Sequence, residues 1–389
     1  MTGPGTLLFF SSTVPIPEGG SFVIFRRHFL PLVEAGAQLS VFSNWGAPAG
    51  TPVYWRHVVL KLRRWYWPPH LPSFLTTVRL RSWLAAGELA RRGDLEGPGP
   101  RIVLTNLWDP QALIARAVAE RYRLPLGVFV HDDELRWRSG SEPVRFMRWK
   151  RNRVLDGAHQ IWSVSNRLTG TFSAAQQRRT RLLRPIPGSA FRAARAPTFR
   201  PGLHVGYAGK VYPRLEPVLE ALAEQLRRRG GQLTVIGRSW SSATGAGPVA
   251  FQTPFATPEQ AMQWLRENCS ALVVAHPAPE PAADPAWHML DTSFPSKLPE
   301  FVQLGLPLIL LAPADSEFGD WCRAQSAVPW FASAADPALG VYLESLGEHV
   351  GWERAASGTR QLAATQFDPE QIQATFLSDL SRLSASSPA

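Results

Sequence analysis

Short apolar runs of strand length alternate with amphipathic runs of helix length along the chain. The first unit joins TLLFFSS (6–12) through a helix-like stretch at 22–36 to QLSVFSN (38–44). Further apolar runs follow at 101–106, 126–133 and 160–165. Strands separated by helices pair in parallel, so this alternation predicts doubly wound α/β sheets with helices on both faces.

The alternation breaks once and then restarts, which indicates two domains. Residues 178–200 hold seven arginines, three prolines and no acidic residue, a composition typical of a connecting segment. The pattern resumes with LHVGYAGK (203–210), and 389 residues suit two cores better than one. We therefore expect an N-terminal Rossmann-like domain at 1–185, a linker at 186–202, a second Rossmann-like domain at 203–367, and a C-terminal helix at about 368–384 that packs back on the first domain.

Charge divides the chain in the same way. Residues 1–200 contain 29 Lys and Arg against 12 Asp and Glu, whereas residues 201–389 contain 12 against 19. Three basic stretches, at 56–92, 136–153 and 178–200, are mixed with tryptophans. Such a surface suits an anionic acceptor or an anionic membrane surface; nucleic acid and a plain arginine-rich surface are the other interpretations.

Several classes of protein are excluded by composition. Cys269 and Cys322 are too few for a disulfide framework or a cysteine zinc site. The apolar N-terminal run lacks a basic flank and is too short to span a bilayer. We expect a cytoplasmic protein, with a peripheral position at the inner membrane surface as the second expectation. Asp132, Asp133 and Glu134 form one short acidic run without spaced ligands, so we expect no metal and no cofactor.

Two motifs in the second half predict a phosphate site. SFPSKLPEFVQLGLPLILL (293–311) predicts a tight turn and a short helix with Ser296 and Lys297 in its first turn and Glu300 close behind. Unpaired N–H groups at a helix N-terminus, together with a lysine and a hydroxyl, suit a phosphate. GYAGK ends the first strand of the second domain with Gly209 and Lys210, and Arg214 follows four residues later. A glycine there lets a diphosphate approach the backbone.

The pairing of GYAGKVYPRLEPVLEAL with FPSKLPEFVQLGLPLIL resembles the nucleotide-sugar half of GT-B glycosyltransferases, particularly the retaining family 4. The resemblance implies two Rossmann-like domains facing each other across a cleft, a nucleotide diphosphate-sugar donor and no metal. It assigns Lys210 and Arg214 to the donor diphosphate and Glu300 to the donor ribose. The family carries a glutamate eight positions before Glu300, where this chain has Thr292; Asp291 is the adjacent substitute. Subfamilies with a PSKL-type turn rely more on Ser296 and Lys297.

Three weaker signals complete the predicted site. His131 follows the apolar strand LGVFV, where glycosyltransferases of this class often place a histidine near the donor sugar; a solvated loop histidine is the alternative. Gly20, with Gly19, follows the first strand and fits the loop that approaches the donor, although two-glycine turns are common. Phe255 is expected near the base, and a hydrophobic contact leading into the next helix explains it equally well.

Taken with the resemblance, these observations predict a hexosyltransferase that moves a sugar from a nucleotide diphosphate-sugar to an acceptor held by the basic first domain. The resemblance implies that the reaction retains the configuration. His131, Lys210 and Lys297 are the predicted catalytic residues, and no nucleophile is named. The alternatives are a non-catalytic binding or scaffold protein with a degenerate donor site, which the Thr292 departure motivates, and a nucleotide-sugar epimerase, which needs carboxylates that converge on the sugar.

Overall fold

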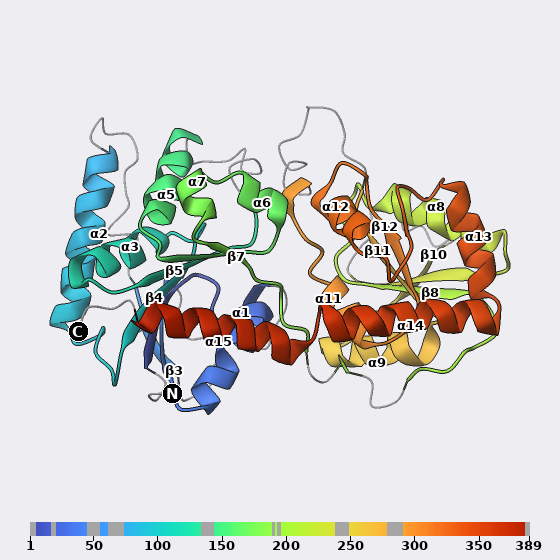
Figure 1. Cartoon of the computed structure of the whole chain (residues 1–389), viewed down its shortest axis with the longest axis horizontal. Helices are drawn as coiled ribbons and strands as arrows, with labels where there is room; N and C mark the ends of the chain where they lie inside the picture. Colours follow the sequence, from blue (N-terminus) through green and yellow to red (C-terminus); the bar gives the residue numbers. More distant parts are fainter. Residues whose placement is uncertain are drawn as a thin grey trace. The chain divides into compact units, whose positions relative to one another are not determined.

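The computed structural model describes residues 5–16, 21–44, 55–60, 74–133, 144–188, 191–192, 196–237, 249–277 and 291–385. The chain forms two compact units (Figure 1). Unit 1 comprises residues 1–184 and 372–389, and unit 2 comprises residues 185–371. Each unit is built on one parallel sheet, which confirms the predicted α/β class.

Unit 1 contains a sheet with the strand order β3-β2-β1-β4-β5-β6-β7 among its described residues. Its elements are β1 (Thr6–Phe10), α1 (Ser21–Glu34), β2 (Gln38–Ser43), β3 (Trp55–Val59), α2 (Phe74–Arg91), β4 (Arg101–Asn106), α3 (Ala112–Tyr122), β5 (Leu126–Val130), α5 (Val144–Asp156), β6 (Gln160–Ser163), α6 (Asn166–Gly170), α7 (Ala174–Gln177) and β7 (Thr180–Leu182). Of the basic stretch at 56–92, β3 and α2 are the described elements, and residues 61–73 lie outside the described residues.

The central strands of the unit 1 sheet are buried on both faces, so β1 and β5 are buried at every position rather than at alternate ones. Leu8 and Phe10 of β1 belong to the core shared with α2, α3 and α5. Phe9, between them, points to the other face and packs on Phe25 and Phe29 of α1, with ring centroids 5.0 and 4.8 Å away. The side-chain period of two along a strand explains this division.

The C-terminal helix α15 (Pro369–Ala385) completes the aromatic face of unit 1. The ring of Phe376 lies 5.2 Å from that of Trp162 and 5.0 Å from that of His28. Trp162 also donates its indole N–H to the buried Asp379 carboxylate at 2.9 Å. An apolar stripe and one buried polar contact therefore hold α15 on the first domain, where the sequence placed it.

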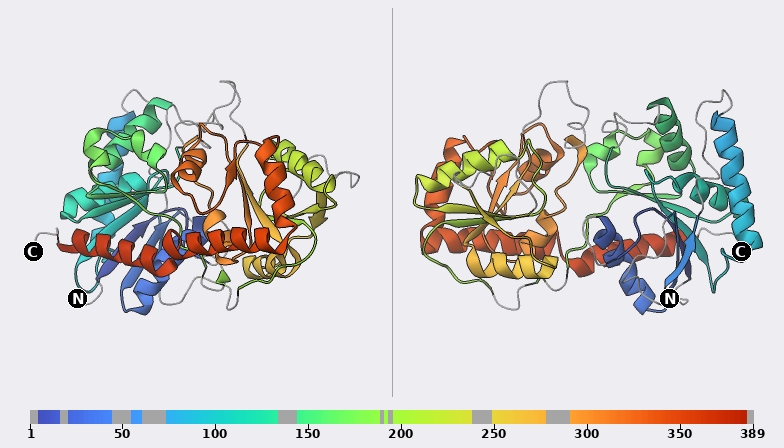
Figure 2. Two further views of the ribbon diagram at one scale, coloured as in Figure 1. Left: turned by 45° about the vertical axis from the view of Figure 1, so that its right-hand side comes forward. Right: turned by 180° about the vertical axis from the view of Figure 1, so that it is seen from behind.

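Unit 2 has the strand order β10-β9-β8-β11-β12-β13 among its described residues. Its elements are β8 (His204–Ala208), α8 (Glu216–Arg227), β9 (Gln232–Ile236), β10 (Val249–Gln252), α9 (Pro258–Asn268), β11 (Ala271–Ala275), α11 (Leu298–Gln303), β12 (Leu308–Leu311), α12 (Glu317–Ala324), β13 (Trp330–Phe331), α13 (Pro337–Leu346) and α14 (His349–Thr365). Figure 2 shows helices on both faces of this sheet. α8 and α13 pack on one face, and α9, α11, α12 and α14 on the other.

The segment at 186–202, expected as a linker, belongs to unit 2. Phe191 is 2% exposed within its core, and the Phe199 ring lies 6.0 Å from that of Trp352. Phe191 and Phe199 attach this segment to the core of unit 2, although arginines and prolines surround them in the sequence. Among the described helices, none has the length and apolar character needed to cross a bilayer.

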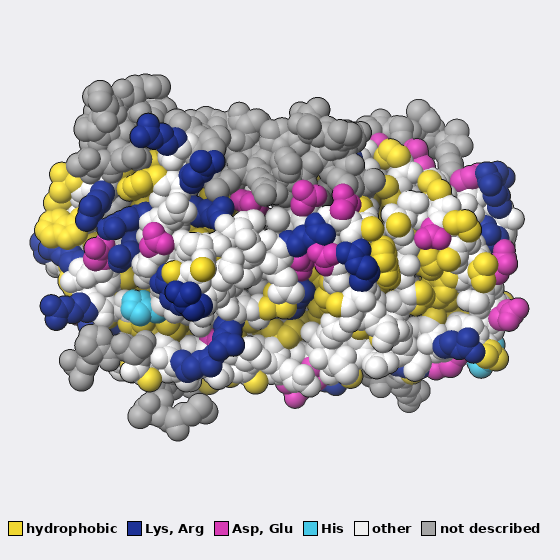
Figure 3. All heavy atoms as spheres, turned by 45° about the horizontal axis from the view of Figure 1, so that its top comes forward, with side chains coloured by type: hydrophobic (Ala, Val, Ile, Leu, Met, Phe, Trp, Pro, Cys, Tyr) yellow, Lys and Arg dark blue, Asp and Glu magenta, His cyan; other side chains and the backbone are white. Residues whose placement is uncertain are grey.

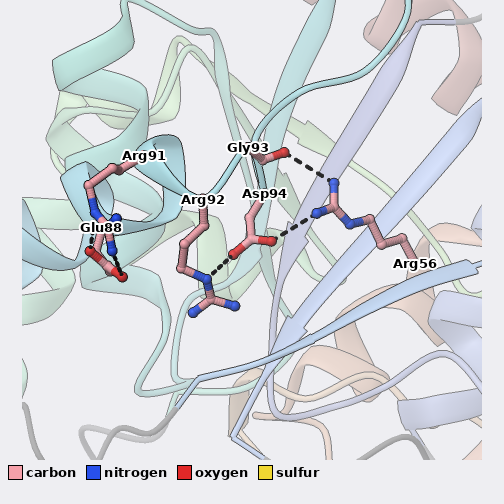
Figure 4. Close-up of polar contacts among 6 residues, drawn as sticks. All are labelled: Arg56, Glu88, Arg91, Arg92, Gly93 and Asp94. Atoms are coloured by element: carbon pink, nitrogen blue, oxygen red, sulfur yellow. Dashed lines mark hydrogen bonds and ion pairs between the residues drawn. The ribbon is translucent and has the colours of Figure 1, made fainter.

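A buried carboxylate ties the edge strand of unit 1 to the end of α2 (Figure 4). Asp94 is 5% exposed and binds Arg56 of β3 at 2.8 Å and Arg92 at 2.9 Å. Arg56 also donates to the Gly93 carbonyl at 3.2 Å. Because β3 pairs with β2 alone in the described sheet, this ion-pair network stabilises the exposed edge of the sheet.

We expect Asp94→Ala to lower the free energy of unfolding of unit 1 by about 1–2 kcal/mol, because the arginines lose charge-assisted hydrogen bonds yet can reach water. Calorimetric melting would measure this. Glu88→Ala is the matched control, since it removes the neighbouring but exposed pair with Arg91 and should leave the melting temperature unchanged. Equal effects of the two substitutions would contradict the structural role of Asp94.

Candidate functional site

At the carboxyl edge of the unit 2 sheet there is a point where the order in which the strands are added reverses. The chain runs from β8 outward to β9 and β10 and then returns to β11 on the other side of β8. Ligands of doubly wound sheets bind beyond the strand ends at such a switch point. Gly209 follows β8, Gly237 follows β9 and His276 follows β11.

Two glycines allow close packing at this edge. Gly209 has φ +119°, which L side chains rarely adopt, and it donates its N–H to the Ile236 carbonyl at 2.8 Å. A Cβ on Gly237 would lie 2.3 Å from the Gly209 oxygen, and a Cβ on Gly209 would lie 2.4 Å from Cε of Lys297. No side chain fits at either position without movement, so the two glycines allow the strand ends and the Lys297 side chain to pack directly against backbone.

Lys297 extends over Gly209 and contacts Tyr207 of β8. Its ammonium group donates to the Tyr207 hydroxyl and lies 4.0 Å from the centre of that ring. The Tyr207 hydroxyl in turn donates to the Lys210 carbonyl at 3.0 Å. Burial lowers the pKa of Lys297 to about 7, with the negative charge of Glu300 acting in the opposite direction. Burial raises the pKa of the Tyr207 hydroxyl, so it stays a neutral donor.

The predicted cradle of helix N–H groups is wrong in its detail. α11 begins at Leu298, so Ser296 and Lys297 precede the helix, and Ser296 is exposed. The Leu298 N–H already bonds the Pro295 carbonyl at 3.1 Å, the Glu300 N–H bonds the Lys297 carbonyl at 3.1 Å, and Pro299 has no N–H. With six residues the helix also has only a small dipole. The lysine side chain, rather than the helix end, supplies the positive charge.

The other predicted donor contacts lie on segments near this edge. Lys210 is exposed, with its ammonium 4.9 Å from the Tyr212 ring centre, and Arg214 is half-buried in the turn before α8. Glu300 is half-buried on α11, and its charge acts on Lys297. Asp291 is half-buried just before Thr292, which is 3% exposed.

Phe255 packs on its own following helix. Its ring lies 6.3 Å from that of Trp264 in α9. The alternative interpretation, a hydrophobic contact leading into a helix, therefore accounts for its position. Gly19 and Gly20 lie outside the described residues.

His276 belongs to this edge and was missed. Its ring lies 5.1 Å from that of Phe318, and its Nδ1 atom has no hydrogen-bond partner within the described part of the chain. Burial first, and then the charge of Lys297, lowers the pKa of His276 to about 4. The signal was present, because His276 follows the apolar strand SALVVA as His131 follows LGVFV.

His131 lies in unit 1 at the carboxyl end of β5. Its ring is 5.1 Å from that of Phe25 and 6.4 Å from that of Phe129. Burial lowers its pKa to about 4, so the imidazole is neutral near pH 7. A neutral ring can accept or donate a hydrogen bond without carrying charge.

A polar network missed by the sequence occupies the switch point of the unit 1 sheet, between β1 and β4. Asp109 accepts hydrogen bonds from the Ser11 hydroxyl and, at 3.0 Å, from the Ser12 N–H. The Ser12 hydroxyl lies 3.0 Å from Oε1 of Gln111. Burial raises the pKa of Asp109 above its ordinary value, opposed by the Ser11 hydrogen bond and the charge of Lys150.

Within the described residues, no cluster of three or more His, Cys, Asp or Glu side chains is placed to hold a metal ion. Asp132 and Asp133 are described, whereas Glu134 is not.

Known structures resemble the whole chain, although no protein-family model matches it and neither does any curated protein. A glycosyltransferase from Rickettsia africae superposes with a TM-score of 0.67 at 11% identity, over 99% of this chain and 100% of that one. The α,α-trehalose 6-phosphate synthase of Burkholderia multivorans gives 0.62 at 13% identity, over 100% of both chains. The fold is GT-B. Anabaena HepE, solved in complex with UDP-glucose, gives 0.59 at 13% identity, over 97% and 99%.

The GT-B fold agrees with the two doubly wound sheets and with the strand orders described above. At 11–13% identity, these likenesses concern the fold. Any activity therefore has to be argued from the side chains of this chain.

Proposed function

We propose that this protein transfers a hexose from a nucleotide diphosphate-sugar to an acceptor held by unit 1. The observation that carries the proposal is the ammonium of Lys297, held by Tyr207 against the backbone of Gly209 at the switch point of unit 2. An ammonium in a partly dry site interacts strongly with an anion, because water screens the charge less there.

The proposed roles follow from charge and position. Lys297 stabilises the negative charge that develops on the leaving diphosphate, assisted by Lys210 and Arg214. The Ser296 hydroxyl contacts the phosphate oxygens, and the absence of a side chain at Gly209 leaves the room that the Lys297 side chain occupies. Glu300 accepts hydrogen bonds from the ribose hydroxyls. Fixed charges that are in place before the reaction lower the barrier without reorganisation, which is the largest expected contribution here.

The sugar and the base have fewer candidates. His131 orients the donor sugar, Asp291 takes the place of the absent first glutamate, and the loop at Gly20 approaches the donor. Phe255 remains the candidate for the base, although its contact with Trp264 already accounts for it. We propose a retaining reaction of the family 4 type, without metal and without a covalent intermediate. The two lysines and the arginine then neutralise the negative charge of the leaving diphosphate.

Three considerations support this proposal. HepE was solved with UDP-glucose, and a trehalose-6-phosphate protein of E. coli, whose structure has a TM-score of 0.61 to this one, with UDP-2-fluoro glucose. The basic composition of unit 1 suits an anionic or membrane-associated acceptor. Cys269 and Cys322 are buried free thiols, in keeping with a cytoplasmic site of action.

We expect at least one nucleotide diphosphate-sugar to raise the melting temperature in a screen over bases and sugars, because a ligand that binds only the folded state stabilises it. At about 100 times its dissociation constant, a donor should contribute about 2.7 kcal/mol. The matched control is the same sugar attached to a monophosphate. It should bind more weakly, because it offers one phosphate group fewer to the cations of the site. If no donor shifts the melting curve, the proposed function is rejected.

Buried Thr292 stands where the family has a glutamate, and this favours a second candidate, a binding protein with a degenerate donor site. The two candidates differ in turnover. A transferase releases the nucleotide diphosphate of its donor when an extract that contains the acceptor is added. Without an acceptor it releases the nucleotide diphosphate slowly, by hydrolysis of the donor. A binding protein gives the thermal shift with no release.

A further inference from the structure

A hollow of about 820 Å³ lies in unit 1, at the edge of the sheet where β5, β6 and β7 begin. Its wall includes His159 and Gln160 at the start of β6 and Arg181 of β7. Because the strands are parallel, this edge is opposite to the one that carries His131. The hollow is therefore not the carboxyl-edge site where a doubly wound domain holds its substrate.

The wall of the hollow is strongly basic. It contains six arginines and three acidic residues. The acids are already engaged: Asp379 pairs with Arg382, Glu120 binds Arg153 at 2.8 Å, and Asp156 accepts a glutamine N–H at 2.8 Å. Figure 3 shows several Lys and Arg side chains close together on the surface of unit 1. The positive charge around the hollow thus exceeds what the acids neutralise.

Arginines at the ends of helices often bind free carbonyls, and one of the six does so. Arg179 donates to two carbonyls at the end of α5 and just beyond it, one of them at 3.1 Å. Arg123, Arg178 and Arg181 are exposed and make no ion pair or side-chain hydrogen bond with the described part of the chain. Helix capping therefore does not account for these three cations.

His159 and Arg116 also line the hollow. Nδ1 of His159 accepts the Leu126 N–H at 3.2 Å, so the neutral ring carries its proton on Nε2. The Nε atom of Arg116 is buried and has no hydrogen-bond partner among the described residues. Arg116 lies over Gly157, where a Cβ would come within 1.8 Å of that Nε. Burial, followed by the charges of Arg116 and Arg179, lowers the pKa of His159, as expected in a positive field.

We propose that this hollow is a second anion site, which binds a ligand carrying phosphate groups through Arg178, Arg181 and Arg123. Planar guanidinium groups bind phosphate oxygens in pairs, and three of them suit a diphosphate or two neighbouring phosphates. A volume of about 820 Å³ leaves room for the organic part of a phosphate ester. The site is separate from the donor site of unit 2 and does not depend on the proposed transfer.

Pyrophosphate binding, measured by calorimetry in a Lys297→Ala background, tests the proposal, because that background weakens the donor site. We expect one site whose affinity falls about tenfold or more in Arg178→Glu/Arg181→Glu, since two charge-assisted contacts become repulsive. Arg178→Gln/Arg181→Gln should weaken binding less. Unchanged affinity in both double variants, or no pyrophosphate binding to the background protein, overturns the proposal.

Arg91→Glu/Arg227→Glu is the control, because it changes the net charge equally at exposed, ion-paired arginines outside the hollow. Equal losses in both charge-reversed proteins would indicate a general electrostatic effect and reject a site. Flotation with vesicles of phosphatidylcholine, with and without phosphatidate, identifies the source of the phosphate. Binding to phosphatidate that depends on Arg178 and Arg181 assigns a lipid headgroup, whereas pyrophosphate binding alone assigns a soluble ester.

Discussion

Lys297→Ala is expected to reduce turnover of a nucleotide diphosphate-sugar by about 100- to 1,000-fold, the range seen when one fixed group that stabilises a developing anion is removed. The ammonium is held by Tyr207 against the backbone of Gly209, and a water molecule in the space left by the alanine would carry no charge. The measurement is the initial rate of nucleotide diphosphate release at saturating donor. Arg228→Ala, which removes an exposed cation at the far end of α8, should leave the rate unchanged.

The pKa of Lys297 adds a pH signature to this prediction. Its value of about 7 in the free protein means that the ammonium is lost as the pH rises through 7. Donor affinity should therefore fall by up to about tenfold per pH unit above 7, until the pKa of the bound form is reached. Lys297→Arg keeps its charge and should flatten this profile. A wild-type profile that is flat between pH 6 and 9 would contradict the assignment.

Unit 1 is expected to lose stability sharply between pH 6.5 and pH 4. Burial lowers the pKa of His131 to about 4, and burial first, followed by the charges of His131 and Arg27, lowers the pKa of His28 to about 3. In the unfolded chain both titrate near 6.5, so below that pH the unfolded state binds more protons and stability falls until the folded pKa is reached. The shift of His131 alone corresponds to about 3 kcal/mol.

This prediction is measured from the melting temperature of unit 1 across that pH range. His28→Leu should reduce the slope of melting temperature against pH. His28 is 2% exposed and packed on Phe376, and leucine at this position has no proton to gain when the chain unfolds. His349→Gln removes a histidine of unit 2 and should leave the slope of unit 1 as it is. If wild type and His28→Leu show the same acid response, the histidine pair is not its cause.

The fold followed from the sequence because both sheets are buried on two faces. Runs such as TLLFF and ALVVA are apolar at every position, so their type and order could be recognised without any contact information. The segment around Phe191 and Phe199 could not be recognised, because two apolar anchors among arginines and prolines carry no period. Their burial depends on partners such as Trp352, which lie far away in the sequence.

The candidate site was predictable where it depends on local sequence. A glycine after β8 and a lysine after a Pro-containing turn were both recognised, and the structure brings Gly209 and Lys297 together. The role of Tyr207 in holding Lys297 could not be recognised, because that contact depends on the arrangement of α11 against β8. The prediction that the N-terminus of α11 offers N–H groups to a phosphate is wrong, because Pro299 has no N–H and the Leu298 N–H is already bonded.

α15 has a consequence for the order in which the chain can mature during synthesis. The segment 185–371 leaves the ribosome complete, whereas unit 1 still lacks residues 372–389 at that moment. Until then Trp162 and Phe129 have no Phe376 to cover them. Although its sequence begins first, the N-terminal domain is thus the last to finish, and a nascent chain exposes an aromatic surface that chaperones could bind.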